Sequence, residues 1–210
     1  MSEARIKRQY TIVARVYDPL VKLWTKVVGT EVEKELNNFL REHLDETSTI
    51  LELGCGTARN LEHICSLNLK FKKYLGLDFS PQMLAVARSK FSNNSAIEFK
   101  EQDITLIDYP IEKFDIILCT WVLSHFESPS VLVNKAQALL EHGGRFFLIF
   151  FTKPKWYINF WLYPLATYLF SAVPVSEKEI RKFNNVRVRH SHASNITTCV
   201  EVYDNEAQRT

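Results

Sequence analysis

Residues 49–60 read TILELGCGTARN, a short apolar segment that runs directly into a turn with two glycines. The apolar part is typical of a strand that is buried on both faces of a parallel sheet. Gly54 and Gly56 suit a tight turn, and they let a ligand approach bare backbone. Because ligands of open α/β sheets bind beyond the carboxyl ends of the strands, this turn is the first candidate for a binding site.

The alternation of apolar runs and helical segments continues along the chain. Four further runs have the length and apolarity of strands, and they span 74–78, 96–100, 114–120 and 145–151. Helical spacing of apolar residues is found in 31–42, in 80–91 and in a segment that opens at Ser128–Pro129, where Leu132, Ala136, Leu139 and Leu140 are predicted on the buried face. A serine followed by proline suits a helix N-terminus, and Gly143–Gly144 suits the end of the last helix. Strands that alternate with helices in this way predict a doubly wound α/β sheet.

Two regions depart from the alternation. Residues 1–46 precede the first strand and are predicted to be helical, and an apolar segment at 153–183 follows the fifth strand. The runs at 186–192 and 197–203 have the pattern of two closing strands. We therefore expect one domain over 1–210: N-terminal helices at 1–46, a core at 47–152, an insertion at 153–183 and closing strands at 184–210.

Composition excludes several classes of protein. The 210 residues are 46% hydrophobic and 24% charged, which argues against disorder and against a multi-span membrane protein. The net charge is +2, from 26 basic and 24 acidic residues, and this balance argues against a nucleic-acid partner. The four cysteines, at 55, 65, 119 and 199, have neither disulfide nor metal-ligand spacing, so we expect no metal. With no apolar leader at the N-terminus, a reducing, cytoplasmic location is expected.

Three acidic residues stand at or near three successive predicted strand ends. Glu52 belongs to the first strand, Asp78 ends the second and Asp103 follows the third. Asp78 can accept both hydroxyls of a ribose, whereas Glu52 and Asp103 suit a cationic amine and an exocyclic amino group. A dinucleotide site, as in a nicotinamide-dependent oxidoreductase, would require a third glycine at the position of Arg59. A purely structural strand-to-helix turn is the remaining alternative.

Five stretches of the sequence carry a family resemblance. In order and spacing, the motifs of 45–152 resemble those of class I S-adenosylmethionine (SAM)-dependent methyltransferases: LELGCGTARN, GLDFSPQML, EFKEQDI, FDIILCTWVLSHF and LLEHGGRFFLIFF. Upstream, Tyr10, Ala14, Tyr17 and Asp18 resemble the opening of the branch that includes ubiquinone and menaquinone biosynthesis methyltransferases. The resemblance implies a Rossmann-like, mostly parallel seven-stranded sheet whose last strand is antiparallel.

The same resemblance implies roles for individual residues. The methionine part of SAM would be lined by Glu52, Gly54, Cys55 and Gly56. Asp78 would hold the ribose, with Thr120 closing the site. The adenine would lie near Phe79, Met83, Asp103 and Ile104, and Tyr10 and Tyr17 would cover the cofactor. The chain departs from the family at Ala58, where a third glycine is common. It also lacks the Asn/Asp-Pro-Pro-Tyr box after the fourth strand, which argues against nucleobase and glutamine substrates.

For methyl transfer from SAM, an enzyme mainly has to align the acceptor with the methyl group and exclude water. A general base is needed only if the acceptor is a phenol, an alcohol or an acidic carbon. His125, just past the fourth strand, is the candidate base and substrate contact; a structural histidine is the alternative. Trp121 is either a wall of the acceptor pocket or part of the core. His190 and His192, on a late strand, are expected to lie away from the chemistry.

Residues 156–175 contain no charge and are rich in aromatic side chains. Pro164 and Pro174 argue against a membrane span, so a lid that brings Trp156, Phe160 and Trp161 to the acceptor is favoured. Peripheral membrane contact and plain packing are the alternatives. These features together predict a methyltransferase that acts on a small hydrophobic acceptor such as a quinone, a lipid or another apolar metabolite. A non-catalytic SAM-binding module and a methyltransferase for polar molecules are the competing hypotheses.

Overall fold

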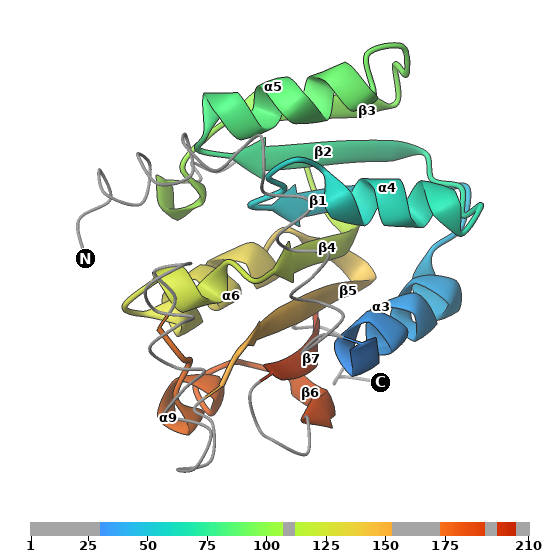
Figure 1. Ribbon diagram of the computed structural model, residues 1–210. Coiled ribbons are helices and arrows are strands. Elements are labelled where there is room, and N and C mark those ends of the chain that lie inside the picture. Colours follow the sequence, from blue (N-terminus) through green and yellow to red (C-terminus); the bar gives the residue numbers. More distant parts are fainter. Residues whose placement is uncertain (1–29, 107–111, 153–172, 192–196, 205–210) are drawn as a thin grey trace.

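A computed structural model describes residues 30–106, 112–152, 173–191 and 197–204 of the chain. They form a seven-stranded sheet in the order β3-β2-β1-β4-β5-β7-β6 (Figure 1). The strands are β1 (Thr49–Leu53), β2 (Lys73–Asp78), β3 (Ile97–Glu101), β4 (Phe114–Thr120), β5 (Leu140–Phe151), β6 (Val186–Ser191) and β7 (Thr197–Tyr203). Only β7 runs antiparallel to its neighbours, β5 and β6. The predicted Rossmann-like sheet and its antiparallel last strand are therefore confirmed.

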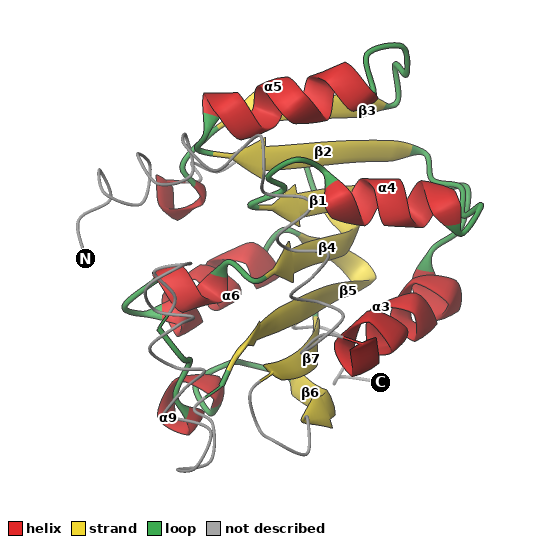
Figure 2. Cartoon of the chain, in the orientation of Figure 1, coloured by secondary structure: helices red, strands yellow, loops and turns green. Residues whose placement is uncertain are grey.

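Helices pack on both faces of the sheet (Figure 2). One face is covered by α3 (Thr30–His43), α4 (Arg59–Ser66) and α5 (Pro81–Lys90), whose apolar side chains join a buried cluster with Ile50, Ile116 and Phe147. The other face is covered by α6 (Pro129–Gln137), with the short α9 (Glu177–Ile180) beside it, over a second cluster that contains Leu51, Ile117 and others. A sheet that is buried on both faces explains why its central strands are continuous apolar runs.

The strand order reverses at β1, which pairs with β2 on one side and with β4 on the other. All three strands are parallel, so their carboxyl ends meet at the same edge of the sheet. The connections after β1 and β4 therefore leave this edge in opposite directions and open a crevice between them. The turn that begins at Gly54 lies at this switch point.

The structure corrects the predicted boundary between the last helix and the fifth strand. Helix α6 ends at Gln137, and Leu139 and Leu140, which we expected on its buried face, lie beyond it. Leu140 instead pairs with Phe114 at the start of β5, and the register then shifts between Phe114 and Ile116. A Cβ on Gly144 would lie 2.9 Å from the carbonyl oxygen of Glu141. Glycine is therefore required at position 144 because the backbone of Glu141 lies so close, and not because a helix ends there.

The two predicted serine caps differ. The Oγ of Ser80 accepts a hydrogen bond from the backbone N–H of Met83 at 3.4 Å and caps α5, whereas Ser128 makes no capping bond from its side chain. The thiols of all four cysteines are free. Most of the apolar stretch, 156–172, lies outside the described residues. Among the helices that are described, none is both long and apolar enough to cross a membrane.

Candidate active site at the ends of β1, β2 and β4

The turn after β1 depends on glycine at two positions with different surroundings. Gly54 has a φ of 70°, and a Cβ there would lie 2.4 Å from Cγ2 of Val122. Gly56 has a φ of 53°, but a Cβ there would meet nothing within 4 Å. Gly54 is thus needed for packing, whereas the backbone at Gly56 faces open space into which a ligand can enter. Ala58 also adopts a left-handed conformation, with a φ of 62°, which explains why glycine is favoured there.

The carboxylate of Asp78 joins the glycine turn to the end of β2. Its Oδ2 accepts the backbone N–H of Gly56 at 2.9 Å, and its Oδ1 accepts the N–H of Ser80 at 2.8 Å. The residue is only 7% exposed, and burial raises the pKa of its carboxyl, while the backbone hydrogen bonds oppose the rise. Each carboxylate oxygen can accept more than one hydrogen bond, so Asp78 keeps the capacity to bind a ligand hydroxyl.

Glu52 is the most deeply buried acid of the site, with 2% of its surface exposed. Its Oε2 accepts a hydrogen bond from the Tyr74 hydroxyl at 2.5 Å, and its Oε1 accepts one from Nδ2 of Asn60 at 2.9 Å. Burial raises the pKa of Glu52 to about 7; both hydrogen bonds lower this pKa, and the nearby Asp78 raises it. We therefore expect Glu52 to change its charge near neutral pH.

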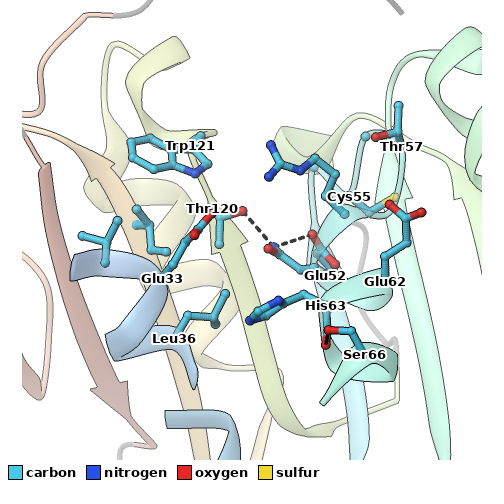
Figure 3. A pocket seen from close by; sticks show the side chains of 16 residues that line it. Glu33, Leu36, Glu52, Cys55, Thr57, Glu62, His63, Ser66, Thr120 and Trp121 are labelled. Atoms are coloured by element: carbon cyan, nitrogen blue, oxygen red, sulfur yellow. Dashed lines mark hydrogen bonds between the residues drawn. The ribbon is translucent and has the colours of Figure 1, made fainter. Parts of the chain in front are cut away.

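The polar network continues from β1 to β4. Nδ2 of Asn60 also donates a hydrogen bond to Oγ1 of Thr120 at 2.8 Å, so one amide group connects the first turn of α4 to two strand ends (Figure 3). Tyr74 adds a third strand, β2, through Glu52. A network that spans three strands and a helix fixes these side chains beneath the glycine turn.

A cavity of about 350 Å³ lies between α3 and α4, next to this network. One part of its wall is polar and contains Glu33, Glu52, Asn60, Glu62 and His63. Another part is apolar and contains Val32, Leu36, Trp121 and Ile149. Of the residues predicted to contact a ligand, the cavity brings together Glu52, Gly54, Cys55, Gly56, Thr120 and Trp121. The cavity thus offers both charged groups and an apolar surface to whatever it binds.

Trp121 adopts a backbone conformation that is rare for a large side chain, with a φ of 67°. Its N–H donates to the carbonyl oxygen of Ile149 at 2.7 Å, and its ring centroid lies 5.0 Å from that of Phe151. The indole therefore packs on β5 and lines the cavity at the same time.

The other predicted contacts lie beside the cavity rather than in its wall. Asp78 and Phe79 stand at the end of β2. Asp103 follows β3, where its Oδ1 accepts hydrogen bonds from the backbone N–H and the hydroxyl of Thr105 at 2.8 and 2.7 Å. Met83 and Ile104 are buried. Tyr10, Tyr17, Trp156, Phe160 and Trp161 lie outside the described residues.

A model of the methyltransferase domain matches residues 51–148. The ubiquinone biosynthesis O-methyltransferase of Coxiella burnetii is 26% identical over 176 residues, which cover 80% of this chain and 73% of that protein. Residues 51–148 thus form a SAM-dependent methyltransferase domain. The malonyl-[acyl-carrier protein] O-methyltransferase of Halalkalibacterium halodurans is 27% identical to this methyltransferase over 66% of the chain and 52% of that protein.

Solved structures share the fold of this methyltransferase. The N-methyltransferase NodS of Bradyrhizobium japonicum, in complex with S-adenosylhomocysteine, superposes with a TM-score of 0.61 at 18% identity and covers 85% of this chain and 88% of its own. A SAM-dependent methyltransferase of Mesorhizobium loti superposes with a TM-score of 0.59 at 19% identity, over 79% of this chain and 96% of its own. At these identities the likeness shows the fold alone.

Of the histidines His63 and His125 of the methyltransferase, the cavity is lined by His63. His125, the predicted base, ends a 3₁₀ turn at Leu123–His125 after β4 and is not among the residues that line the cavity. His63, on α4, does line it and shares a hydrogen bond with Oδ1 of Asn37 on α3. Burial lowers the pKa of His63, which favours the neutral imidazole.

The cavity residues of the methyltransferase that sequence reasoning missed include Arg59, Asn60 and His63. The sequence does contain a pattern that relates two of them, because Asn60 and His63 are three residues apart in the helix that follows the glycine turn. Such spacing puts two side chains on one face of a helix. That this face turns towards α3 depends on tertiary packing, which the spacing does not specify.

Proposed function

We propose that this methyltransferase transfers the methyl group of SAM to a small, predominantly apolar acceptor by in-line displacement. The observation that carries the proposal is a single cavity that joins the glycine turn after β1 to an apolar wall. That wall comes from Val32 and Leu36 of α3, from Trp121 after β4 and from Ile149 of β5. A cavity with a few polar groups and an apolar face is typical of a small-molecule site.

The cofactor is proposed to lie along the edge of the sheet, with its methionine half in the cavity. Glu52, Gly54, Cys55, Gly56 and Thr120 would line this half. The adenosine half would run towards β2 and β3, where Asp78 would bind the ribose and where Phe79, Met83, Asp103 and Ile104 would lie near the adenine. The open space over Gly56 and the unused acceptor capacity of Asp78 support this fit.

When bound, SAM supplies a sulfonium whose methyl group is already activated for displacement. The chain then has to align the acceptor with that group and to keep water away. Trp121 is suited to alignment, because its backbone is held by Ile149 and its ring by Phe151. Val32 and Leu36 of α3 close the opposite side with apolar surface.

An acceptor with a hydroxyl group needs a base, and we propose His125 for this role. Its turn directly follows the strand whose end, Thr120, belongs to the cavity. His63 is the second candidate, because it lines the cavity and its lowered pKa leaves the imidazole neutral at pH 7. A neutral imidazole can accept the hydroxyl proton as the oxygen attacks the methyl carbon.

The segment at 153–183 is proposed as the lid of the acceptor site, with Trp156, Phe160 and Trp161 facing the acceptor. A quinone would suit such an aromatic site, and the Coxiella relative is named for ubiquinone biosynthesis. The Halalkalibacterium relative is named for a malonyl carrier protein, so the relatives do not agree on an acceptor. Peripheral membrane contact belongs to the same proposal, since an apolar acceptor would reside in a membrane.

The test uses SAM labelled on its methyl group, incubated with purified protein and an extract of host cells. Label in the organic phase supports the apolar acceptor, and the Asp78→Ala variant, in which SAM binding is weakened, should reduce it. Label in the aqueous or protein fraction overturns the apolar acceptor but keeps the methyltransferase. Bound SAM without any labelled product would favour a non-catalytic binding module, and NAD binding in competition with SAM would contradict the assigned cofactor site.

A further inference from the structure

Strand β4 leaves the sheet before β5 ends, so the last backbone groups of β5 are bonded by other segments. The two strands are paired as far as Thr120 and Ile149, and the N–H of Trp121 donates to the carbonyl oxygen of Ile149 at 2.7 Å. The φ of 67° at Trp121 then turns the chain away from β5. Because N–H groups two residues apart point to the same side of a strand, the N–H of Phe151 faces the position that β4 has left.

Ser124 fills this position. Its Oγ accepts the N–H of Phe151 at 3.3 Å, and its carbonyl oxygen accepts the N–H of Val173 at 2.7 Å. The carbonyl oxygen of Phe151 in turn accepts the N–H of Val175 at 2.8 Å, next to a parallel bridge between Thr152 and Val175. Ser124 thus joins the turn after β4 to the end of β5 and to the segment at Val173. It is 1% exposed, so a bond that is lost here is not readily replaced by a bond to water.

We propose that Ser124 is a positioning residue for the methyl acceptor. This inference rests on the proposed function, because it requires that the acceptor lies against Trp121. The ring of Trp121 lines the cavity and packs on the ring of Phe151, with 5.0 Å between the centroids. Ser124 is not among the described residues that line the cavity, and it acts on this wall through the backbone of Phe151, which its hydroxyl group holds.

The wall needs this support because Trp121 has an unfavourable backbone conformation. A large side chain keeps a positive φ only where its surroundings impose it. Both contacts that hold Trp121, from its N–H to Ile149 and from its ring to Phe151, are made with the last residues of β5. A shift at the end of β5 would therefore change the surface that the acceptor meets. The proposed cofactor contacts at the ends of β1 and β2 have hydrogen bonds of their own, so cofactor binding should not change.

The experiment separates acceptor binding from cofactor binding in Ser124→Ala. Transfer of label from the methyl group of SAM into the organic phase is measured over a dilution series of the host-cell extract, which gives an apparent KM for the acceptor. This apparent KM should rise about 5-fold, because a hydrogen bond of ordinary strength is lost. The dissociation constant of S-adenosylhomocysteine, measured by titration calorimetry, should stay unchanged. Amide hydrogen exchange at Phe151 and Val173 should become faster.

Two further variants distinguish positioning from a general loss of stability. Ser124→Thr keeps the hydroxyl group and should bring the apparent KM back to that of the unmodified protein. Ser48→Ala is the matched control, because Ser48 is also a buried serine whose Oγ accepts a backbone N–H, that of Asp45 at 3.0 Å. Ser48 precedes β1 at the opposite edge of the sheet. Its loss should lower the midpoint of urea unfolding and leave the apparent KM unchanged.

An unchanged apparent KM in Ser124→Ala would overturn the proposal, and so would an equal rise in Ser48→Ala or a rise that Ser124→Thr does not reverse. Equal weakening of S-adenosylhomocysteine binding would contradict the specific role at the acceptor.

Two outcomes concern the unmodified protein and the folding of the variant. If the unmodified protein gives no label in the organic phase, the proposed function fails and the role of Ser124 with it, which is distinct from a loss confined to the variant. Should Ser124→Ala not fold, Ser124→Cys takes its place, because its sulfur is only a weak acceptor. An unchanged apparent KM in Ser124→Cys would then contradict the proposal.

Discussion

The backbone N–H of Gly56 donates a hydrogen bond to Oδ2 of Asp78 at 2.9 Å and so ties the turn after β1 to the end of β2. The carboxylate therefore has two tasks, since it shapes the turn and is proposed to bind the ribose. Loss of Asp78 removes both contributions from the same place.

Asp78→Ala should weaken SAM binding by about 1–3 kcal/mol, because charge-assisted hydrogen bonds to the ribose are lost. Titration calorimetry measures the effect. Asp115→Ala is the matched control: its carboxylate also joins two strands, through the N–H and hydroxyl of Thr49 at 2.8 and 2.7 Å, but at the opposite edge of the sheet. An unchanged dissociation constant in Asp78→Ala would remove Asp78 from the cofactor site.

Glu52→Gln should change how stability depends on pH. The pKa of Glu52 is raised to about 7, so the folded state favours its neutral form. Ionisation of Glu52 therefore costs stability progressively as pH rises from about 4.5 to about 7, by roughly 3 kcal/mol in total. Glutamine does not ionise and does not have this loss.

Urea unfolding at pH 5, 6, 7 and 8 measures this effect. The stability of Glu52→Gln relative to the unmodified protein should rise from pH 5 to pH 7 and then level off. The pKa of Asp78 is also raised, but Asp78 is present in both proteins and its contribution cancels to a first approximation. A difference that is independent of pH would show that Glu52 ionises normally in the folded protein.

Alanine at the two glycines of the turn should have unequal effects. Gly54→Ala meets Val122 at 2.4 Å in addition to an unfavourable φ, whereas Gly56→Ala meets only the unfavourable φ. Gly56→Ala should cost about 1–2 kcal/mol of unfolding free energy, and Gly54→Ala should cost more. Denaturant unfolding of both variants checks the order.

The steric part of the Gly54→Ala effect can be isolated with a double variant. Val122→Ala removes the two methyl groups that a Cβ at position 54 would meet, so it should restore part of the stability of Gly54→Ala. Additive effects of the two substitutions would mean that the clash with Val122 does not determine the requirement for glycine.

The two candidate bases can be separated by kinetics. With a hydroxyl acceptor, His125→Gln should lower kcat about 100-fold, because the variant cannot accept the proton, while SAM binding stays unchanged. His63→Gln keeps a group that can hydrogen bond to Asn37 and should retain most of the activity. The opposite result would assign the base to His63, and equal activity of both variants would mean that the acceptor needs no base.

The sheet could be predicted from the sequence because parallel strands that are buried on both faces are continuous apolar runs. The boundaries of β1, β4 and β7 agree with the expected ranges, and each has a strongly apolar interior. The predicted start of β5 was wrong because Leu139 and Leu140 suit the buried face of a helix as well as a strand. Only the pairing of Leu140 with Phe114 across the sheet distinguishes the two, and that contact is not local in the sequence.

The cavity residues were predictable where they stand in the last two positions of a strand or in the turn after it, as for Glu52, Gly54, Gly56 and Thr120. Asn60 could not be found in this way, because its importance lies in bonds to Glu52 and Thr120, 8 and 60 residues away. The acceptor side depends on how α3 lies against α4, and this arrangement is a result of packing rather than of a motif.

The position of β7 in the sheet determines when the sheet can be completed during synthesis of the chain. β7 comes after β6 in the chain, yet it lies between β5 and β6 and pairs with both. During synthesis on the ribosome, β6 emerges first and has no strand to pair with until β7 follows. Until then β5 presents an open apolar edge, which is the kind of surface that chaperones bind and that aggregates form on. Completion of the sheet thus waits until β7, the strand that follows β6 in the chain, has been translated.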